Sequence, residues 1–151
     1  MLERPVFIGM TNPLSDDPAR ALWPQPDGCT GHRLWLMATA GTGISQEEWI
    51  EMTDRRNLCI GEWDRRRAMA RGAELAQELA DRTVVLLGVD AVGCTRILDE
   101  PLLTPLEWSP LRRWTMIPHP SGLNRWYNNH AHRAAVECRL ADIIIDYTGD
   151  Q

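Results

Sequence analysis

Two short loops near opposite ends of the 151-residue chain carry side chains that could do chemistry together. The first spans Gly9–Ser15 (GMTNPLS) and the second spans His119–Arg125 (HPSGLNR). Asn12 offers an amide that could position a water molecule, and His119 offers an imidazole that could donate a hydrogen bond to a leaving group. Such a pair suits the cleavage of a nucleobase from its sugar, in which positive charge develops on the sugar and negative charge on the base.

Each loop follows a short apolar run, residues 5–10 and residues 114–118, which we interpret as buried strands. A third run, residues 83–88, shows no polar alternation, as expected of a parallel strand covered on both faces. Loops that follow parallel strands gather at the carboxyl edge of an open α/β sheet, where ligands bind. The two loops are therefore expected to meet at that edge.

The segments between these strands are helical in character. We predict helices over residues 33–40, from Ser45 onward with Glu48 completing a capping box, over residues 64–81, and from about Asn124 to Leu140. Residues 16–31 and 101–110 are expected to be loops, and residues 143–145 a last short strand or a packed tail. Strands that alternate with helices predict a three-layer α/β/α domain with a short, mainly parallel central sheet.

The two loops also resemble a known family. The first resembles the water-activating motif of the uracil-DNA glycosylase superfamily, nearest to the Gly-x-Asn-Pro form of its mismatch-specific branch. The second resembles that superfamily's His/Asn-Pro-Ser-Gly-Leu loop. Between them, Gly31–Trp35 resembles the helix start that follows the first motif, and Val84–Gly88 resembles a central strand. In order and spacing the resemblance spans most of the chain, which implies a single uracil-DNA glycosylase-like domain over residues 1–151.

The resemblance implies that Asn12 and His119 are the catalytic residues. Asn12 would orient the attacking water without deprotonating it, since an amide is a weak base, and His119 would donate to the base oxygen. The residues expected to bind the base are Gly9, Met10, Thr11, Pro13, Leu14 and Trp23, the last by stacking.

Leu14 stands where the classical enzyme has a tyrosine that excludes a 5-methyl group and where the mismatch branch has glycine. Tolerance of 5-substituted pyrimidines therefore stays open.

The second loop is expected to bind DNA through Ser121, Gly122, Leu123, Asn124 and Arg125. Leu123 matches the family's wedge, which fills the gap left when a base is flipped out of the stack. Alternatively, Leu123 is a hydrophobic staple at a helix start and Arg125 is a solvated residue.

Four further groups of arginines have their own interpretations. Arg33 opens a helix and is either a phosphate contact or solvated, and Arg112–Arg113 is placed to meet a phosphate. The clusters Arg55–Arg56 and Arg65–Arg67 are interpreted as solvated faces.

Composition limits these hypotheses. The formal net charge is −5 and the sequence pI is about 5.3, which argues against strong non-specific nucleic-acid binding. All sixteen basic residues are arginine, so no lysine can form a Schiff base. The four cysteines lack metal-ligand spacing, so we expect no metal site. The resemblance implies no cofactor. The chain shows no signal segment and no transmembrane run, so we expect a cytoplasmic, soluble protein with reduced thiols. We also expect it to be a monomer.

Three functions remain under consideration. The first is a monofunctional DNA glycosylase that removes uracil or a modified pyrimidine by base flipping, as in base-excision DNA repair. The second is a non-catalytic module that binds DNA or a nucleotide on the same fold. The third is an enzyme that acts on free or unusual nucleotides, which the acidic composition favours.

Overall fold

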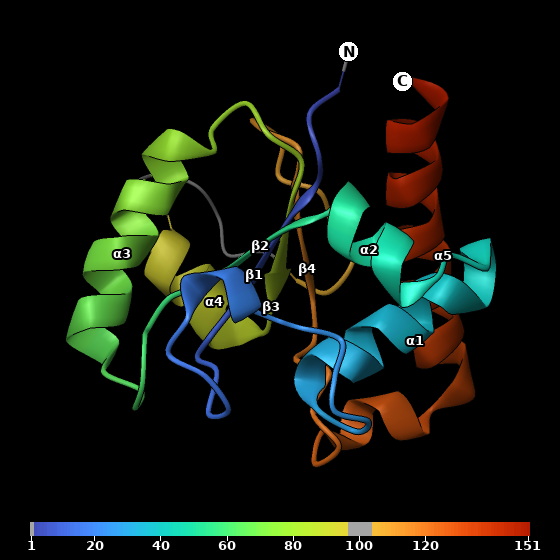
Figure 1. The fold of residues 1–151 in the computed structure, drawn as a ribbon. Coiled ribbons are helices and arrows are strands. Elements are labelled where there is room, and N and C mark those ends of the chain that lie inside the picture. The colour runs from blue at the N-terminus through green and yellow to red at the C-terminus, as the bar shows by residue number, and fades with distance from the viewer. Residues whose placement is uncertain (1, 97–103) are drawn as a thin grey trace.

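The computed structural model describes residues 2–96 and 104–151 (Figure 1). Within these ranges, four parallel strands form one sheet in the order β2-β1-β3-β4. Their bounds are β1 Val6–Gly9, β2 Asp54–Asn57, β3 Val84–Leu87 and β4 Trp114–Ile117. The predicted strands β1, β3 and β4 are confirmed, whereas β2 was not predicted.

Helices cover both faces of the sheet, because alternate strand residues point to opposite sides (Figure 1). Phe7 and Val85 pack against α1 (Thr30–Thr42), α2 (Gln46–Met52) and α5 (His130–Gly149). On the other face lie α3 (Arg65–Glu78) and α4 (Val89–Thr95), which cover the remaining strand side chains. The predicted three-layer α/β/α architecture is confirmed.

Polar side chains define where the helices begin. The Ser45 hydroxyl accepts from the Glu48 backbone N–H at 3.1 Å and donates to the Glu48 carboxylate at 3.2 Å. Asp64 accepts from the backbone N–H groups of Arg66 and Arg67 at the start of α3. The predicted starts of α2 and α3 are therefore correct, and their N-caps satisfy amides that have no partner within the helix. Two short 3₁₀ helices, η1 (Pro18–Arg20) and η2 (Arg125–Asn128), complete the described elements.

The C-terminal prediction was wrong in two respects. Asn129 has an extended backbone and its side chain accepts from the N–H groups of Ala131 and His132, so η2 ends there and a new helix begins. Helix α5 then continues to Gly149, with Ile143 and Ile144 buried inside it. An isolated apolar triplet fits a strand or a helix, and only its spacing from earlier apolar residues distinguishes them.

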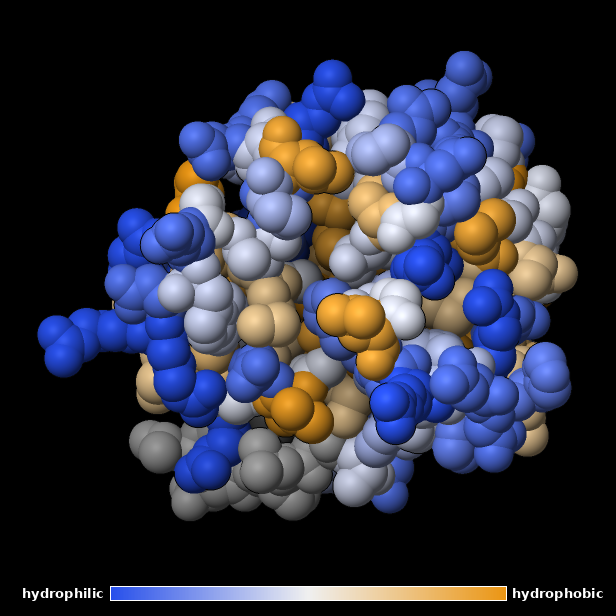
Figure 2. Space-filling view, turned by 90° about the horizontal axis from the view of Figure 1, so that it is seen from below, coloured by the Kyte–Doolittle hydropathy of each residue, from blue (hydrophilic) through white to orange (hydrophobic). Residues whose placement is uncertain are grey.

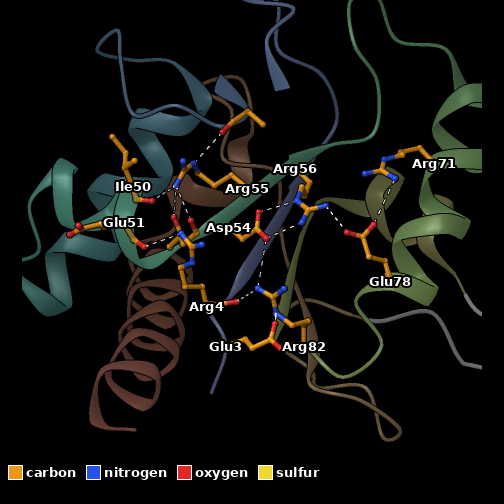
Figure 3. Close-up of polar contacts among 12 residues, drawn as sticks. Glu3, Arg4, Ile50, Glu51, Asp54, Arg55, Arg56, Arg71, Glu78 and Arg82 are labelled. Carbon is orange, nitrogen blue, oxygen red and sulfur yellow. Dashed lines mark hydrogen bonds and ion pairs between the residues drawn. The ribbon is translucent and has the colours of Figure 1, made fainter. Parts of the chain in front are cut away.

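Strand β2 escaped prediction because its side chains are polar, and its arginines are not solvated as predicted. Arg56 donates to the Asp54 carboxylate at 2.9 and 3.0 Å and to Glu78 at 3.1 Å (Figure 3). Arg55 donates to the carbonyls of Ile50 and Thr53 (Figure 3). Both arginines are half-buried, so hydrogen bonds and ion pairs rather than apolar side chains hold β2 at the edge of the sheet.

Helix α4 was also not predicted. Of the expected loop over residues 101–110, the first three lie outside the described residues. The remainder turns back so that Trp108 bridges Thr115 in antiparallel fashion beside β4. In the described part of the chain, no helix is both long enough and apolar enough to cross a membrane.

Candidate functional site

The strand order creates a gap at the carboxyl edge of the sheet. From β1 the chain runs to α1 on one face, and from β3 it runs to α4 on the other, so neighbouring strands send their chains in opposite directions. A pocket of about 530 Å³ opens at this edge. It is lined by Thr11, Asn12, Pro13, Leu14, Ser15, Arg20, Leu22, Trp23, Gln25, Pro26, Gly28, Cys29, Thr30, Gly31, Ser121 and Gly122.

The two loops singled out in the sequence meet at this pocket. Of the predicted site residues, Thr11, Asn12, Pro13, Leu14, Trp23, Ser121 and Gly122 line it. Gly9, Met10, His119, Leu123, Asn124 and Arg125 do not belong to its lining. The structure therefore brings Asn12 and the Ser121–Gly122 turn together and leaves the His119 side chain beside the pocket rather than in its wall.

The Asn12 amide is held at both ends. Its Oδ1 accepts from the Leu14 backbone N–H at 2.9 Å, and its Nδ2 donates to the Arg20 carbonyl at 3.0 Å. These partners define which end of the amide is the oxygen, because one is a donor and the other an acceptor. Oδ1 keeps a second lone pair, which could accept from a water molecule in the pocket.

Gly9, Met10 and Thr11 anchor the first loop. The carbonyls of Gly9 and Met10 accept from the N–H groups of Leu58 and Cys59, which follow β2. The Thr11 hydroxyl donates to the Gly61 carbonyl. These contacts attach the loop to the neighbouring strand exit, so the three residues position Asn12.

Close backbone packing at the start of α1 forms one wall of the pocket. A Cβ on Gly31 would lie 2.1 Å from the Trp23 carbonyl oxygen and 2.5 Å from the carbonyl of Leu22. Leu22 is buried and has a φ of +51°, a conformation that side-chain-bearing residues adopt at some cost. Only a glycine at position 31 lets these two segments touch.

The Trp23 ring already has a cationic neighbour. The Arg20 guanidinium carbon lies 4.6 Å from the ring centroid, and that of Arg55 lies 5.8 Å away. A base that stacks on Trp23 must therefore share the ring with Arg20 or displace it.

His119 is half-buried beside Gly88, where a Cβ would lie 3.2 Å from the His119 Cβ. Burial lowers the pKa of the imidazole, and the negative charge of Asp90 partly opposes this effect. The ring is therefore neutral at neutral pH and can donate one N–H. Within residues 2–96 and 104–151 it has no hydrogen-bond partner, so that donor is available.

Backbone contacts fix the loop that carries His119. The Asn124 side-chain amide donates to the His119 carbonyl at 2.9 Å, and the Tyr127 hydroxyl donates to the Pro118 carbonyl at 2.5 Å. The Ser121 hydroxyl accepts from the Leu123 N–H at 3.2 Å. These contacts position the loop from both of its flanks.

Two leucines project from the loops that form the pocket. Leu123 is 92% exposed and Leu14 is 62% exposed, so neither is packed into the core. Figure 2 shows this end of the molecule, where hydrophobic groups stand apart among hydrophilic ones. The exposure of Leu123 argues against the hydrophobic-staple alternative, because a staple would be covered.

The two arginines expected to meet a phosphate before β4 have partners within the protein. Arg112 donates to the Ala76 carbonyl, and Arg113 pairs with Asp146 at 3.5 Å. Both precede β4, so they lie at the sheet edge opposite the pocket and do not belong to its lining. Elsewhere, the His132 ring stacks on Trp126 with centroids 4.3 Å apart.

Sequence reasoning missed the contributions of Arg20, Gly88 and Asp90 to the site. Gly88 and Asp90 follow β3 directly, so their position after a buried strand could have indicated them. Arg20 gave no signal, because a cation–π contact between residues three apart in an irregular loop follows no periodic pattern.

Among the described residues, no three His, Cys, Asp or Glu side chains are grouped as a metal site. The sequence matches no protein-family model, and no curated protein is detectably similar to it. A function for this chain therefore has to be derived from its own residues.

Proposed function

We propose that the chain is a monofunctional DNA glycosylase of the uracil-DNA glycosylase superfamily, which hydrolyses the N-glycosidic bond of uracil or a modified pyrimidine. One observation carries the proposal: Asn12 and the Ser121–Gly122 turn, the two motifs of the resemblance, line a single pocket. Its volume of about 530 Å³ lies in the range of small-molecule sites and is large enough for one nucleoside.

Asn12 would orient the attacking water through the free lone pair of Oδ1. The water oxygen forms a bond to the anomeric carbon while the bond from that carbon to the base nitrogen breaks, and the electron pair leaves with the base. The proton that the water loses passes to bulk solvent, because an amide is too weak a base to hold it. This chemistry is slower than carboxylate-assisted attack.

His119 would stabilise the departing base. A neutral imidazole can donate its N–H to a base carbonyl as negative charge builds there. The side chain lies outside the pocket lining, so ligand binding has to bring base and imidazole together. Catalytic hydrogen bonds commonly tighten only in the complex, and such a distance does not argue against this role.

The first loop departs from the family's form. Met10 and Thr11 separate Gly9 from Asn12, one residue more than Gly-x-Asn-Pro contains. The longer loop is held through Thr11 and Gly61, and the Asn12 amide is oriented by Leu14 and Arg20. This local support makes an oriented amide possible despite the extra residue.

The exposure of Leu123 supports DNA as the substrate, because an uncovered leucine on a pocket loop can enter a base stack. In this proposal the protein works as a monomer in the cytoplasm. A second candidate, a module that binds a nucleotide without cleaving it, is favoured by the position of His119 outside the pocket lining.

The deciding experiment measures alkali-induced strand cleavage of labelled oligonucleotides. The panel carries uracil, thymine opposite guanine, and 5-substituted pyrimidines in single and double strands, with Asn12→Ala and His119→Ala beside the wild type. Abasic sites on one substrate that both substitutions abolish would support the glycosylase. Nucleotide binding without any product would favour the binding module.

A further inference from the structure

The arginines of this acidic chain fall into two groups. Within residues 2–96 and 104–151, one group forms ion pairs with carboxylates, as Arg56 and Arg82 do in Figure 3: Arg56, Arg65, Arg67, Arg71, Arg82, Arg113 and Arg133. Others form no ion pair with any described carboxylate, among them Arg20, Arg33 and the Arg66 of helix α3. Arg20 lines the pocket, and Arg33 contacts two residues that line it, Gly28 and Gly122. What distinguishes these two unpaired arginines from the others is therefore their position at the pocket.

Arg33 bridges the two sides of the pocket mouth. Its Nε–H donates to the Gly28 carbonyl at 3.1 Å, which fixes the inner edge of the guanidinium. Its Nη2 lies against Gly122, where a Cβ would be only 2.7 Å away. Gly28 and Gly122 both line the pocket. The outer N–H groups of Arg33 have no partner among the described residues, so they remain free to donate.

Arg20 lies on the same rim and is also held in place. Its backbone carbonyl accepts from Asn12, and its guanidinium lies over the Trp23 ring at 4.6 Å. This arrangement restricts the side chain without neutralising it. An ordered, unpaired guanidinium beside a cavity favours an anionic ligand, because it loses little conformational entropy when it binds.

We propose that Arg33 and Arg20 hold a phosphate group of the ligand at the mouth of the pocket, within one nucleotide of the base. The guanidinium fork matches phosphate oxygens and forms charge-assisted hydrogen bonds with them. The absence of a side chain at Gly122 lets the Arg33 guanidinium lie directly against the second loop, at the edge of the pocket. The inference rests on the proposed function only in taking the occupant of the pocket to be a nucleotide.

A purely structural role for Arg33 makes a different prediction. If the side chain only joined Gly28 to Gly122, its replacement would weaken every ligand of the pocket equally. A phosphate contact instead affects phosphorylated ligands selectively, and its effect diminishes as salt concentration rises. The ratio of affinities for a nucleotide and its nucleoside separates the two.

The test is calorimetric titration with deoxyuridine, deoxyuridine 5′-monophosphate, its 3′-monophosphate and a short single-stranded oligonucleotide containing uracil. It uses the wild type, Arg33→Gln and Arg20→Gln, with Arg66→Gln as the matched control, because Arg66 is exposed and forms no ion pair with the described residues. We expect the wild type and the control to bind one of the phosphorylated ligands about tenfold or more tightly than the nucleoside. In Arg33→Gln and in Arg20→Gln, this ratio of affinities for the phosphorylated ligand and the nucleoside should fall to about threefold or less.

An equal gain in all four proteins would overturn the inference. Mononucleotides that bind as tightly as the oligonucleotide would identify a free nucleotide as the source of the phosphate, and much tighter oligonucleotide binding would identify the DNA backbone. This measurement requires no cleavage of the ligand. If the glycosylase assay gives no product but phosphorylated ligands still bind more tightly than the nucleoside, the proposed activity is refuted and the proposed phosphate site is not. Circular dichroism checks that each variant is folded. If Arg33→Gln does not fold, Arg20→Gln still tests the inference, because Arg20 is exposed.

Discussion

The side-chain amide of Asn12 donates to the backbone carbonyl of Arg20 at 3.0 Å, and this contact joins the first loop to the residue whose guanidinium covers Trp23. The other end of the amide accepts from the Leu14 N–H. Asn12 therefore has a structural role, in shaping the loop, and a proposed chemical role, in orienting water. The two roles can be separated by substitution.

Asn12→Asp should raise the rate of base release while lowering stability. A carboxylate can still accept from Leu14 and is a better base toward water, but it cannot donate to the Arg20 carbonyl. We expect a single-turnover rate at least about tenfold higher, since general-base assistance typically contributes more than that. The free energy of unfolding should fall by about 1 kcal/mol, one hydrogen bond. Urea titration and single-turnover cleavage measure the two effects.

Asn12→Ala is the matched comparison. It loses both hydrogen bonds and the oriented oxygen, so base release should disappear while the fold persists. If Asn12→Asp proved no faster than the wild type on every substrate, orientation of water by residue 12 would have to be abandoned.

Gly31→Ala should disrupt the pocket wall. The new Cβ would lie 2.1 Å from the Trp23 carbonyl oxygen, and backbone atoms cannot move aside as a flexible side chain does. We expect a loss of about 2–3 kcal/mol in the free energy of unfolding, as for an overpacked core. Gly149→Ala is the control, because nothing lies within 4 Å of its Cβ and alanine favours a helix. Equal thermal midpoints for the two variants would contradict the close packing.

Tyr127→Phe should loosen the His119 loop. The Tyr127 hydroxyl donates to the Pro118 carbonyl, and burial raises the pKa of the phenol, so the donor stays protonated. Removing it should cost about 1 kcal/mol and should increase hydrogen exchange at residues 119–124. Tyr147→Phe is the control, since the Tyr147 hydroxyl has no hydrogen-bond partner among the described residues. If both variants increased hydrogen exchange at residues 119–124 equally, the hydrogen bond from Tyr127 would not be what holds the loop.

The sequence was sufficient to predict the layers and the meeting of the two loops. Continuous apolar runs such as residues 83–88 indicate a buried strand without knowledge of the rest of the fold. Parallel strands bring their carboxyl ends to one edge of the sheet. Strand β2 could not be found this way, because its side chains are polar and two of the ion pairs that stabilise it, Arg56 with Glu78 and Arg82 with Asp54, join residues that only the fold brings together.

Details of the site depended on contacts that have no periodicity. The position of Asn12 in the first loop was evident, but its bond to Arg20 crosses an irregular segment. The place of His119 beside the pocket rather than in its wall depends on how closely Gly88 packs against it. The residues packed around a loop determine where its side chains point, and a sequence motif does not predict that packing.

Asp54 should make stability depend on acidity. Burial alone would raise the pKa of this carboxyl, but the hydrogen bond from Arg56 and the charges of Arg56, Arg82 and Arg4 outweigh it and lower the pKa below its ordinary value of 3.8. The stabilisation is therefore fully present above that value and is lost as pH falls through the depressed pKa.

Asp54→Asn should lower the free energy of unfolding by about 1.5–3 kcal/mol at neutral pH, the range for a charge-assisted hydrogen bond. The difference from the wild type should shrink in acid. Asp81→Asn, at an exposed carboxylate without a partner among the described residues, should show neither effect. Urea denaturation at neutral pH and at about pH 3 measures both; a gap that widened in acid would contradict the sign.

The decline of the base-release rate at low pH, the acid limb of the activity profile, should reflect the protonation of His119. Burial lowers the pKa of this imidazole below its usual 6.5, and Asp90 partly restores it. If the neutral ring is the working donor, base release stays constant as pH falls past 6.5 and declines only below the depressed pKa. Asp90→Asn removes the charge that raises the pKa, so the decline should move to still lower pH.

Two measurements check this together. Single-turnover cleavage from about pH 4.5 to 8 gives the limb, and an NMR titration of the imidazole gives the pKa of His119 without reference to activity. His119→Asn should flatten the acid limb, because an amide donates at every pH. A limb that stayed unchanged in this variant, or that moved upward in Asp90→Asn, would mean that another group controls the rate and that His119 does not hold the departing base.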